Sequence, residues 1–86
     1  MVTASYVQIE AWLAEGVKLG ARWVLIGCDD FNNDDFPVYV APTDDPHERW
    51  IEITDNGDRV HEGYDLELDL TAQLAERRAW HLPAAE

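Results

Sequence analysis

Apolar residues recur along the chain with two different spacings, and each spacing predicts one kind of element. Near the start, Ile9 and Leu13 stand one helical turn apart and mark the apolar face of an α-helix. Ser5 has the position of a helix N-cap, and Gly20 has that of a glycine ending the helix in the left-handed conformation. The pattern therefore predicts an amphipathic helix over residues 6–19.

Three strands are predicted after this helix. Residues 23–28 (WVLIGC) are apolar throughout and too few for a buried helix, which predicts a central strand covered on both sides. Residues 37–41 (PVYVA) predict its antiparallel neighbour, and because proline is expected to begin a strand, the connecting loop is placed at 29–36. A period of two predicts a third strand over residues 59–68. The positions sharing one face of it are Val60, Glu62, Tyr64, Leu66 and Leu68.

The middle segment, residues 46–58, fits two structures. Asp45 as N-cap and Pro46 at the first helical position predict a short helix as far as Thr54. The Asn56-Gly57 pair after an apolar run instead favours a strand and a tight hairpin. We favour the helix and retain the hairpin as the alternative.

A last helix is predicted over residues 70–81, with Asp69 as its N-cap and Pro83 beyond its end. The whole chain of 86 residues is then one small α+β domain. Its predicted fold is a three-stranded, mostly antiparallel sheet with N- and C-terminal helices and a short middle helix. Because so short a chain builds only a thin core, self-association into a homo-oligomer would help it.

Negative charge is concentrated in the middle of the chain. Residues 29–69 contain 14 of the 18 acidic residues but only Arg49 and Arg59, so this segment carries the whole net charge of −12. Direct binding to nucleic acid is not expected, because that affinity comes mostly from neutralising phosphates with basic side chains. A basic protein is the expected partner, since opposite fields steer encounter.

The location expected from the sequence is the cytoplasm of a host cell, with no membrane partner. No apolar stretch approaches the length of a membrane span, and the first residues lack the order of a signal peptide. Cys28 is the single cysteine, which leaves no internal disulfide and suggests a small buried hydrophobe.

The loop at residues 29–36 is called the acidic loop below. The motifs around it occur in an order that resembles the one in a family of small, uncharacterised bacteriophage-encoded proteins. In that family an N-terminal helix ending in Gly-Ala leads to an apolar strand, Cys-Asp, an acid-rich loop and a Tyr/Phe-Pro-Val-Tyr-Val strand. The resemblance covers most of the chain and implies a phage context and an accessory role, with no activity and no catalytic residues. The matching residues are Gly20, Ala21, Cys28, Asp29, Phe31, residues 35–40, Arg59, Val60, residues 64–66, residues 73–75 and residues 78–81.

The acidic loop is the leading candidate binding site, because carboxylates beside aromatic side chains suit a basic protein surface. Such a surface would imitate nucleic-acid phosphates and antagonise a host or defence protein without catalysis. The alternative is that Phe31 and Phe36 fold back over the core. The candidate partner-binding residues are Asp29, Asp30, Phe31, Asp34, Asp35, Phe36 and Tyr39.

The same loop partly matches a calcium-binding loop. Asp30, Asn32 and Asp34 have the spacing of its first three oxygen ligands. The sixth position, which requires glycine, is Asp35, and the twelfth, which requires glutamate, is Ala41. No metal site is therefore assigned and no cofactor is expected, although a divalent-metal-dependent enzyme using the Asp cluster remains an alternative.

A second candidate site lies near the C-terminus, at Arg77, Arg78 and Trp80. Two guanidinium groups beside an aromatic ring suit a phosphate or a base, particularly if an oligomer brings copies together. The alternative function drawn from them is an oligomeric sponge that sequesters a nucleotide signalling molecule.

Overall fold

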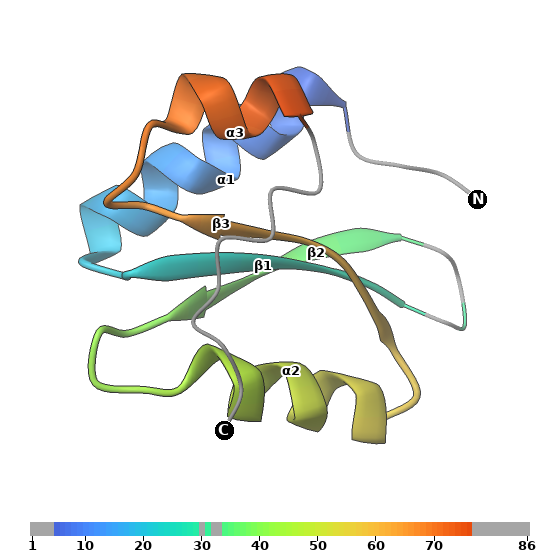
Figure 1. The fold of residues 1–86 in the computed structure, drawn as a ribbon. Helices are drawn as coiled ribbons and strands as arrows, with labels where there is room; N and C mark the ends of the chain where they lie inside the picture. Colours follow the sequence, from blue (N-terminus) through green and yellow to red (C-terminus); the bar gives the residue numbers. More distant parts are fainter. Residues whose placement is uncertain (1–4, 30, 32–33, 77–86) are drawn as a thin grey trace.

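A computed structural model of the chain describes residues 5–29, 31 and 34–76. The described elements, in chain order, are α1 (Tyr6–Leu19), β1 (Trp23–Cys28), β2 (Asp35–Val40), α2 (Pro46–Asp55), β3 (Arg59–Asp65) and α3 (Leu70–Glu76). Among these residues the sheet has three antiparallel strands in the order β2-β1-β3. Helices α1 and α3 lie on one face of the sheet and α2 on the other (Figure 1). The predicted α+β class and element order are confirmed.

The predicted signals at both ends of α1 are confirmed. The Ser5 hydroxyl accepts a hydrogen bond from the Gln8 backbone N–H at 3.2 Å, and Gly20 adopts φ +79°, which L side chains rarely reach. The buried face of the helix presents Ile9, Leu13 and Gly16 to the sheet. As predicted, β1 is buried along its whole length between two layers of helices.

The middle segment is a helix, as favoured, and not a hairpin. The Asp45 carboxylate accepts a hydrogen bond from the His47 backbone N–H at 2.8 Å, and Pro46 occupies the first turn. Asn56 and Gly57 form the turn that follows the helix, where Gly57 has φ +91°. The Asn-Gly pair that suggested a hairpin therefore connects α2 to β3.

Strand β2 begins earlier than predicted, at Asp35, and Pro37 lies inside it opposite Ile26. The loop placed at 29–36 is therefore too long by two residues. Proline is tolerated here because β2 is an edge strand of the described sheet, so its missing N–H removes no bond to a second neighbour.

Strand β3 is shorter than the predicted 59–68 and does not keep a period of two. Ile26 pairs with Glu62, but Gly27 pairs with Val60, so a bulge shifts the register between them. Val60 therefore packs on the α2 side of the sheet, whereas Tyr64 packs on the α1 and α3 side. The prediction of one shared face was wrong, because an extra residue in a strand reverses the side-chain alternation.

In the described part of the chain, the core consists of two apolar clusters separated by the sheet. The cluster under α1 and α3 contains Ile9, Leu13, Val24, Ile26, Tyr64 and Leu74. The cluster over α2 contains Trp23, Leu25, Val40 and Ile53, with Phe36, Val38, Trp50 and Val60 packed against it. Among the described residues, no helix is both long enough and apolar enough to cross a membrane.

Candidate functional site

The acidic loop joins β1 to β2 at one end of the sheet. The Asp29 carboxylate accepts a hydrogen bond from the Phe31 N–H at 2.7 Å, and the Asp29 N–H donates to the Asp34 carbonyl at 2.9 Å. The first bond forms a local turn, and the second closes the loop across its base. The Asp34 side chain is exposed, and Asp29 and Asp35 are partly exposed.

The aromatic residues assigned to this site do not act together. Phe31 is 98% exposed, whereas Phe36 packs against the α2-side cluster with its ring over Gly27. Tyr39 packs on the other side of the sheet, where burial raises the pKa of its phenol and the charge of Glu15 adds to the rise. The structure therefore leaves Phe31 as the exposed aromatic of the three and gives Phe36 and Tyr39 packing roles.

Helix α2 adds a second set of carboxylates, which was not among the sequence-based candidates. Glu48, Glu52 and Asp55 are exposed on its outward side, while Pro46 and Ile53 are buried on the side facing the sheet. The signal was present in the sequence, because Glu48, Glu52 and Asp55 are spaced by four and three residues and so share a helix face.

A shallow hollow connects the loop to the end of α2. It is lined by Asp29, Phe31, Asn56, Gly57 and Asp58. The carboxylates of Asp29 and Asp58 therefore lie next to the end of α2 and, with those of α2 and the turn before it, form the surface called the acidic face below. Its acids are Asp29, Asp44, Asp45, Glu48, Glu52, Asp55 and Asp58, with Arg49 and Arg59 as the basic residues in the same segments of the described chain. Asp35 does not belong to it, because it alternates with Phe36 along β2 and so points to the α1 and α3 side of the sheet.

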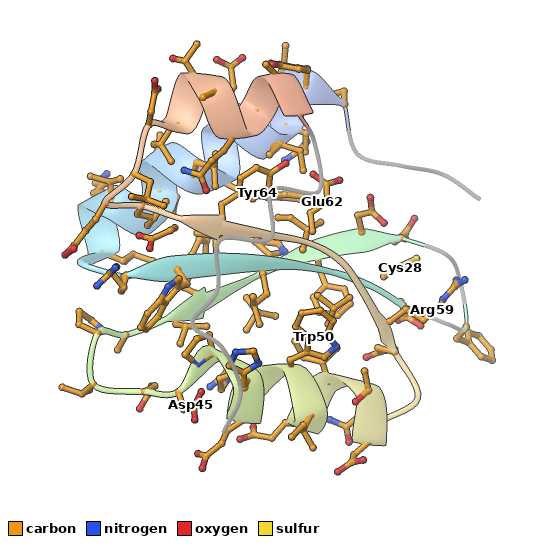
Figure 2. All side chains as sticks on the ribbon, viewed as in Figure 1. Cys28, Asp45, Trp50, Arg59, Glu62 and Tyr64 are labelled. Carbon is orange, nitrogen blue, oxygen red and sulfur yellow. The ribbon has the colours of Figure 1, made fainter. Side chains whose placement is uncertain are left out.

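Cys28 lies at the end of β1 and is fully buried. Arg59 is near it (Figure 2), and its Nη2 lies 3.7 Å from the Cys28 Sγ. Burial raises the pKa of the thiol, the Asp35 carboxylate adds to the rise, and Arg59 opposes it. A buried thiol with a raised pKa is a poor nucleophile, which agrees with the apolar packing role predicted for Cys28.

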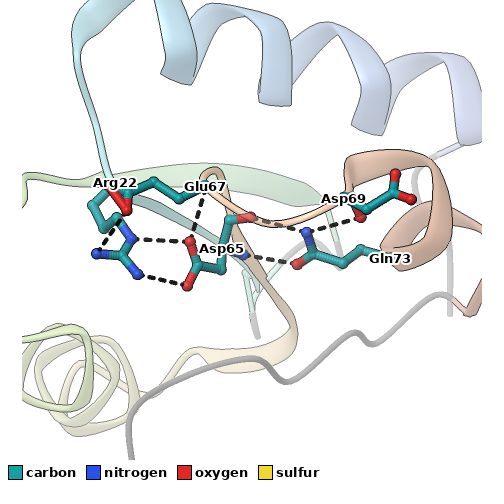
Figure 3. Close-up of polar contacts among 5 residues, drawn as sticks. All are labelled: Arg22, Asp65, Glu67, Asp69 and Gln73. Atoms are coloured by element: carbon teal, nitrogen blue, oxygen red, sulfur yellow. Dashed lines mark hydrogen bonds and ion pairs between the residues drawn. The ribbon is translucent and has the colours of Figure 1, made fainter.

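A polar network ties β3 to α3 and to the residue before β1 (Figure 3). The Arg22 guanidinium donates to both carboxylate oxygens of Asp65 at 2.9 Å, and this pairing raises the pKa of Arg22. The buried Gln73 side chain accepts from the Asp65 N–H at 2.8 Å and donates to the Asp65 carbonyl at 2.9 Å. Because Asp65 and Gln73 are almost fully buried, the network holds the fold together and is not a binding site.

A buried carboxyl group lies on the α1 and α3 side of the sheet. Glu62 is 2% exposed and accepts a hydrogen bond from the hydroxyl of Tyr64, two residues along the same strand (Figure 2). Regular alternation with Tyr64 puts Glu62 on this face, opposite Ile26, because the bulge comes before Glu62 in β3. The sequence pattern places Glu62 on a strand but does not predict its burial.

The remaining candidate residues named from the sequence are Asp30, Arg77, Arg78 and Trp80, and all four lie outside the described residues. Within residues 5–29, 31 and 34–76, no group of three or more His, Cys, Asp or Glu side chains is placed to hold a metal ion.

Comparison with known proteins gave no relative from which a function could be transferred. No protein-family model, curated protein sequence or solved structure matches the chain.

Proposed function

We propose that the protein is a non-enzymatic phage accessory protein whose acidic face binds a basic host protein. The bound partner is a host or defence protein whose nucleic-acid-binding surface accepts carboxylates in place of phosphates. The phage context comes from the resemblance of the motifs around the acidic loop. The binding role is supported by the acidic face itself.

The observation that carries the proposal is the difference between the two sides of α2. Its inward side holds the helix on the sheet through Ile53 and Trp50, while the carboxylates of its outward side, Glu48, Glu52 and Asp55, are exposed. Clustered like charges destabilise the compact state through mutual repulsion, and the helix does not need them for packing. Such a cluster is favourable once an oppositely charged surface covers it, and it speeds the encounter with that surface.

The opposite layer provides a matched control. Glu10 and Glu15 are also exposed on a helix, α1, but lie on the other side of the sheet. The double variants Glu52→Gln with Asp55→Asn and Glu10→Gln with Glu15→Gln change the net charge equally. Neither pair has a packing role in the core clusters, so both variants should fold.

The test is affinity capture from a bacterial lysate, with the retained proteins identified by mass spectrometry. At about 50 mM salt the wild type and the α1 variant should retain the same basic nucleic-acid-binding protein, and about 500 mM salt should release it, because salt screens exposed charges. The α2 variant should retain much less. Equal retention by both variants, or retention that does not depend on salt, would contradict the proposal.

A further inference from the structure

The outward face of α2 has an apolar residue among its carboxylates. Ile51 is 57% exposed, and Glu48, Glu52 and Asp55 precede or follow it by three, one and four residues. On an α-helix the offsets of three and four place Glu48 and Asp55 beside the isoleucine, and Glu52 lies farther round on the same side. The face is therefore not uniformly acidic but has an apolar residue at the edge of a stripe of carboxylates.

Packing of the helix does not account for Ile51. Ile53 and Trp50 of α2 belong to the α2-side cluster, and Pro46 is buried on the same side of the helix. Isoleucine is also a weaker helix former than leucine, glutamate or lysine, so an exposed isoleucine does not favour α2. An exposed apolar side chain next to a stripe of carboxylates offers a partner both an apolar contact and charged groups to pair with.

We infer that the outward face of α2 docks a basic amphipathic helix of a partner protein. An apolar side chain of that helix covers Ile51, while its lysines or arginines pair with Glu48, Glu52 and Asp55. Charge complementarity selects the basic partner, and the helical spacing of the four positions selects a helix, whose side chains repeat with the same period. The ten residues of α2 extend about 15 Å, which corresponds to two to three turns of the partner.

This inference rests on the proposed function and makes it more specific. A surface that only imitated phosphates would attract any cation of suitable charge. The apolar side chain of Ile51 beside the carboxylates adds a preference for cationic helices with an apolar stripe.

Two synthetic peptides distinguish docking of an amphipathic helix from attraction of any cationic chain. One is an amphipathic leucine–lysine helix, and the other is an oligolysine with the same number of charges and no apolar side chain. Titration of the ¹⁵N-labelled full-length protein with each peptide, followed by NMR, gives both the affinity and the amides that move. The variants are Ile51→Ala and, as a matched control, Val7→Ala, which truncates an exposed β-branched residue of α1 that is 74% exposed.

The leucine–lysine helix should bind the wild type more tightly than oligolysine and should shift the amides of α2. Ile51→Ala should weaken it by about fivefold to tenfold, the effect of removing a few buried methyl or methylene groups, and should leave oligolysine binding unchanged. Val7→Ala should change neither affinity. Alanine favours helix, so loss of α2 would not explain the effect.

Two results would overturn the inference. If Ile51→Ala binds the leucine–lysine helix as tightly as the wild type, or the shifted amides lie on α1 and α3, docking on α2 is wrong, while salt-dependent oligolysine binding leaves the proposed function intact. If neither peptide binds at low salt, the inference and the proposed function both fail.

Discussion

Replacement of Gly16 by alanine tests how closely α1 approaches the sheet. Gly16 is buried on the inward face of α1. A Cβ added there would lie 2.8 Å from the Val24 Cγ2 and 3.0 Å from the Leu66 Cδ1, both closer than ordinary van der Waals contact. The substitution therefore forces either a side chain or the whole helix to move.

Two opposing effects set the size of the change. Alanine is better than glycine in a helix by about 1 kcal/mol. Overpacking a tight core costs about 1–3 kcal/mol. Leu66 can turn its flexible end away, but Val24 is fully buried on the central strand and its β-branched side chain is stiff. We therefore expect overpacking to prevail, with a net destabilisation of about 1 kcal/mol, or about 4–8 °C in Tm.

Thermal and urea unfolding, followed by tryptophan fluorescence, measures the effect. The control is Ala11→Gly, the reverse exchange at an exposed position of the same helix, which should cost about 1 kcal/mol through helix propensity alone. Both substitutions should lower the urea midpoint with an unchanged slope. If Gly16→Ala instead stabilises the protein by about the amount that Ala11→Gly destabilises it, the close approach of α1 to β1 is wrong.

Three further predictions follow from the buried groups. The Cys28 thiol should react slowly with a thiol reagent in the folded protein and rapidly in urea. Because folding raises the pKa of this thiol, the free energy of unfolding should fall as pH rises through the range where the unfolded thiol ionises. Tyr39 should ionise above the usual range of tyrosine in an ultraviolet titration, and Glu15→Gln should reduce its pKa only in part, because burial is the larger cause. Gln73→Ala should cost about 2–4 kcal/mol in urea unfolding, because it leaves the N–H and carbonyl of the buried Asp65 without that partner; a loss below about 0.5 kcal/mol would show that water replaces the side chain.

The elements that sequence predicted best are those with local signals. Ser5 and Gly20 define the ends of α1, and Asp45 with Pro46 starts α2, because caps and turns depend on residues only a few positions apart. The bulge in β3 carried no such signal. It becomes visible only when β3 pairs with β1, and it moves Val60 to the other face of the sheet.

The candidate site was likewise predicted only where its signals are local. The acidic loop was evident from composition, but whether Phe31 or Phe36 was exposed depended on the packing of β2 against Gly27 and the α2-side cluster. The pairing of Arg22 with Asp65 joins residues 43 positions apart and has no local signature. The outward face of α2 was predictable from the spacing of its carboxylates once the segment was known to be helical.

The most direct test of the central claim is competition for the captured partner. The basic partner recovered by affinity capture is purified and bound to fluorescently labelled double-stranded DNA. The acidic 86-residue protein is then added while the anisotropy of the DNA is recorded. We expect near-stoichiometric release of the DNA at low salt, weaker release by the Glu52→Gln, Asp55→Asn variant, and unchanged release by the Glu10→Gln, Glu15→Gln variant. If the DNA stays bound to the basic partner while the acidic protein joins them in a ternary complex, the claim that the acidic face takes the place of phosphates is contradicted.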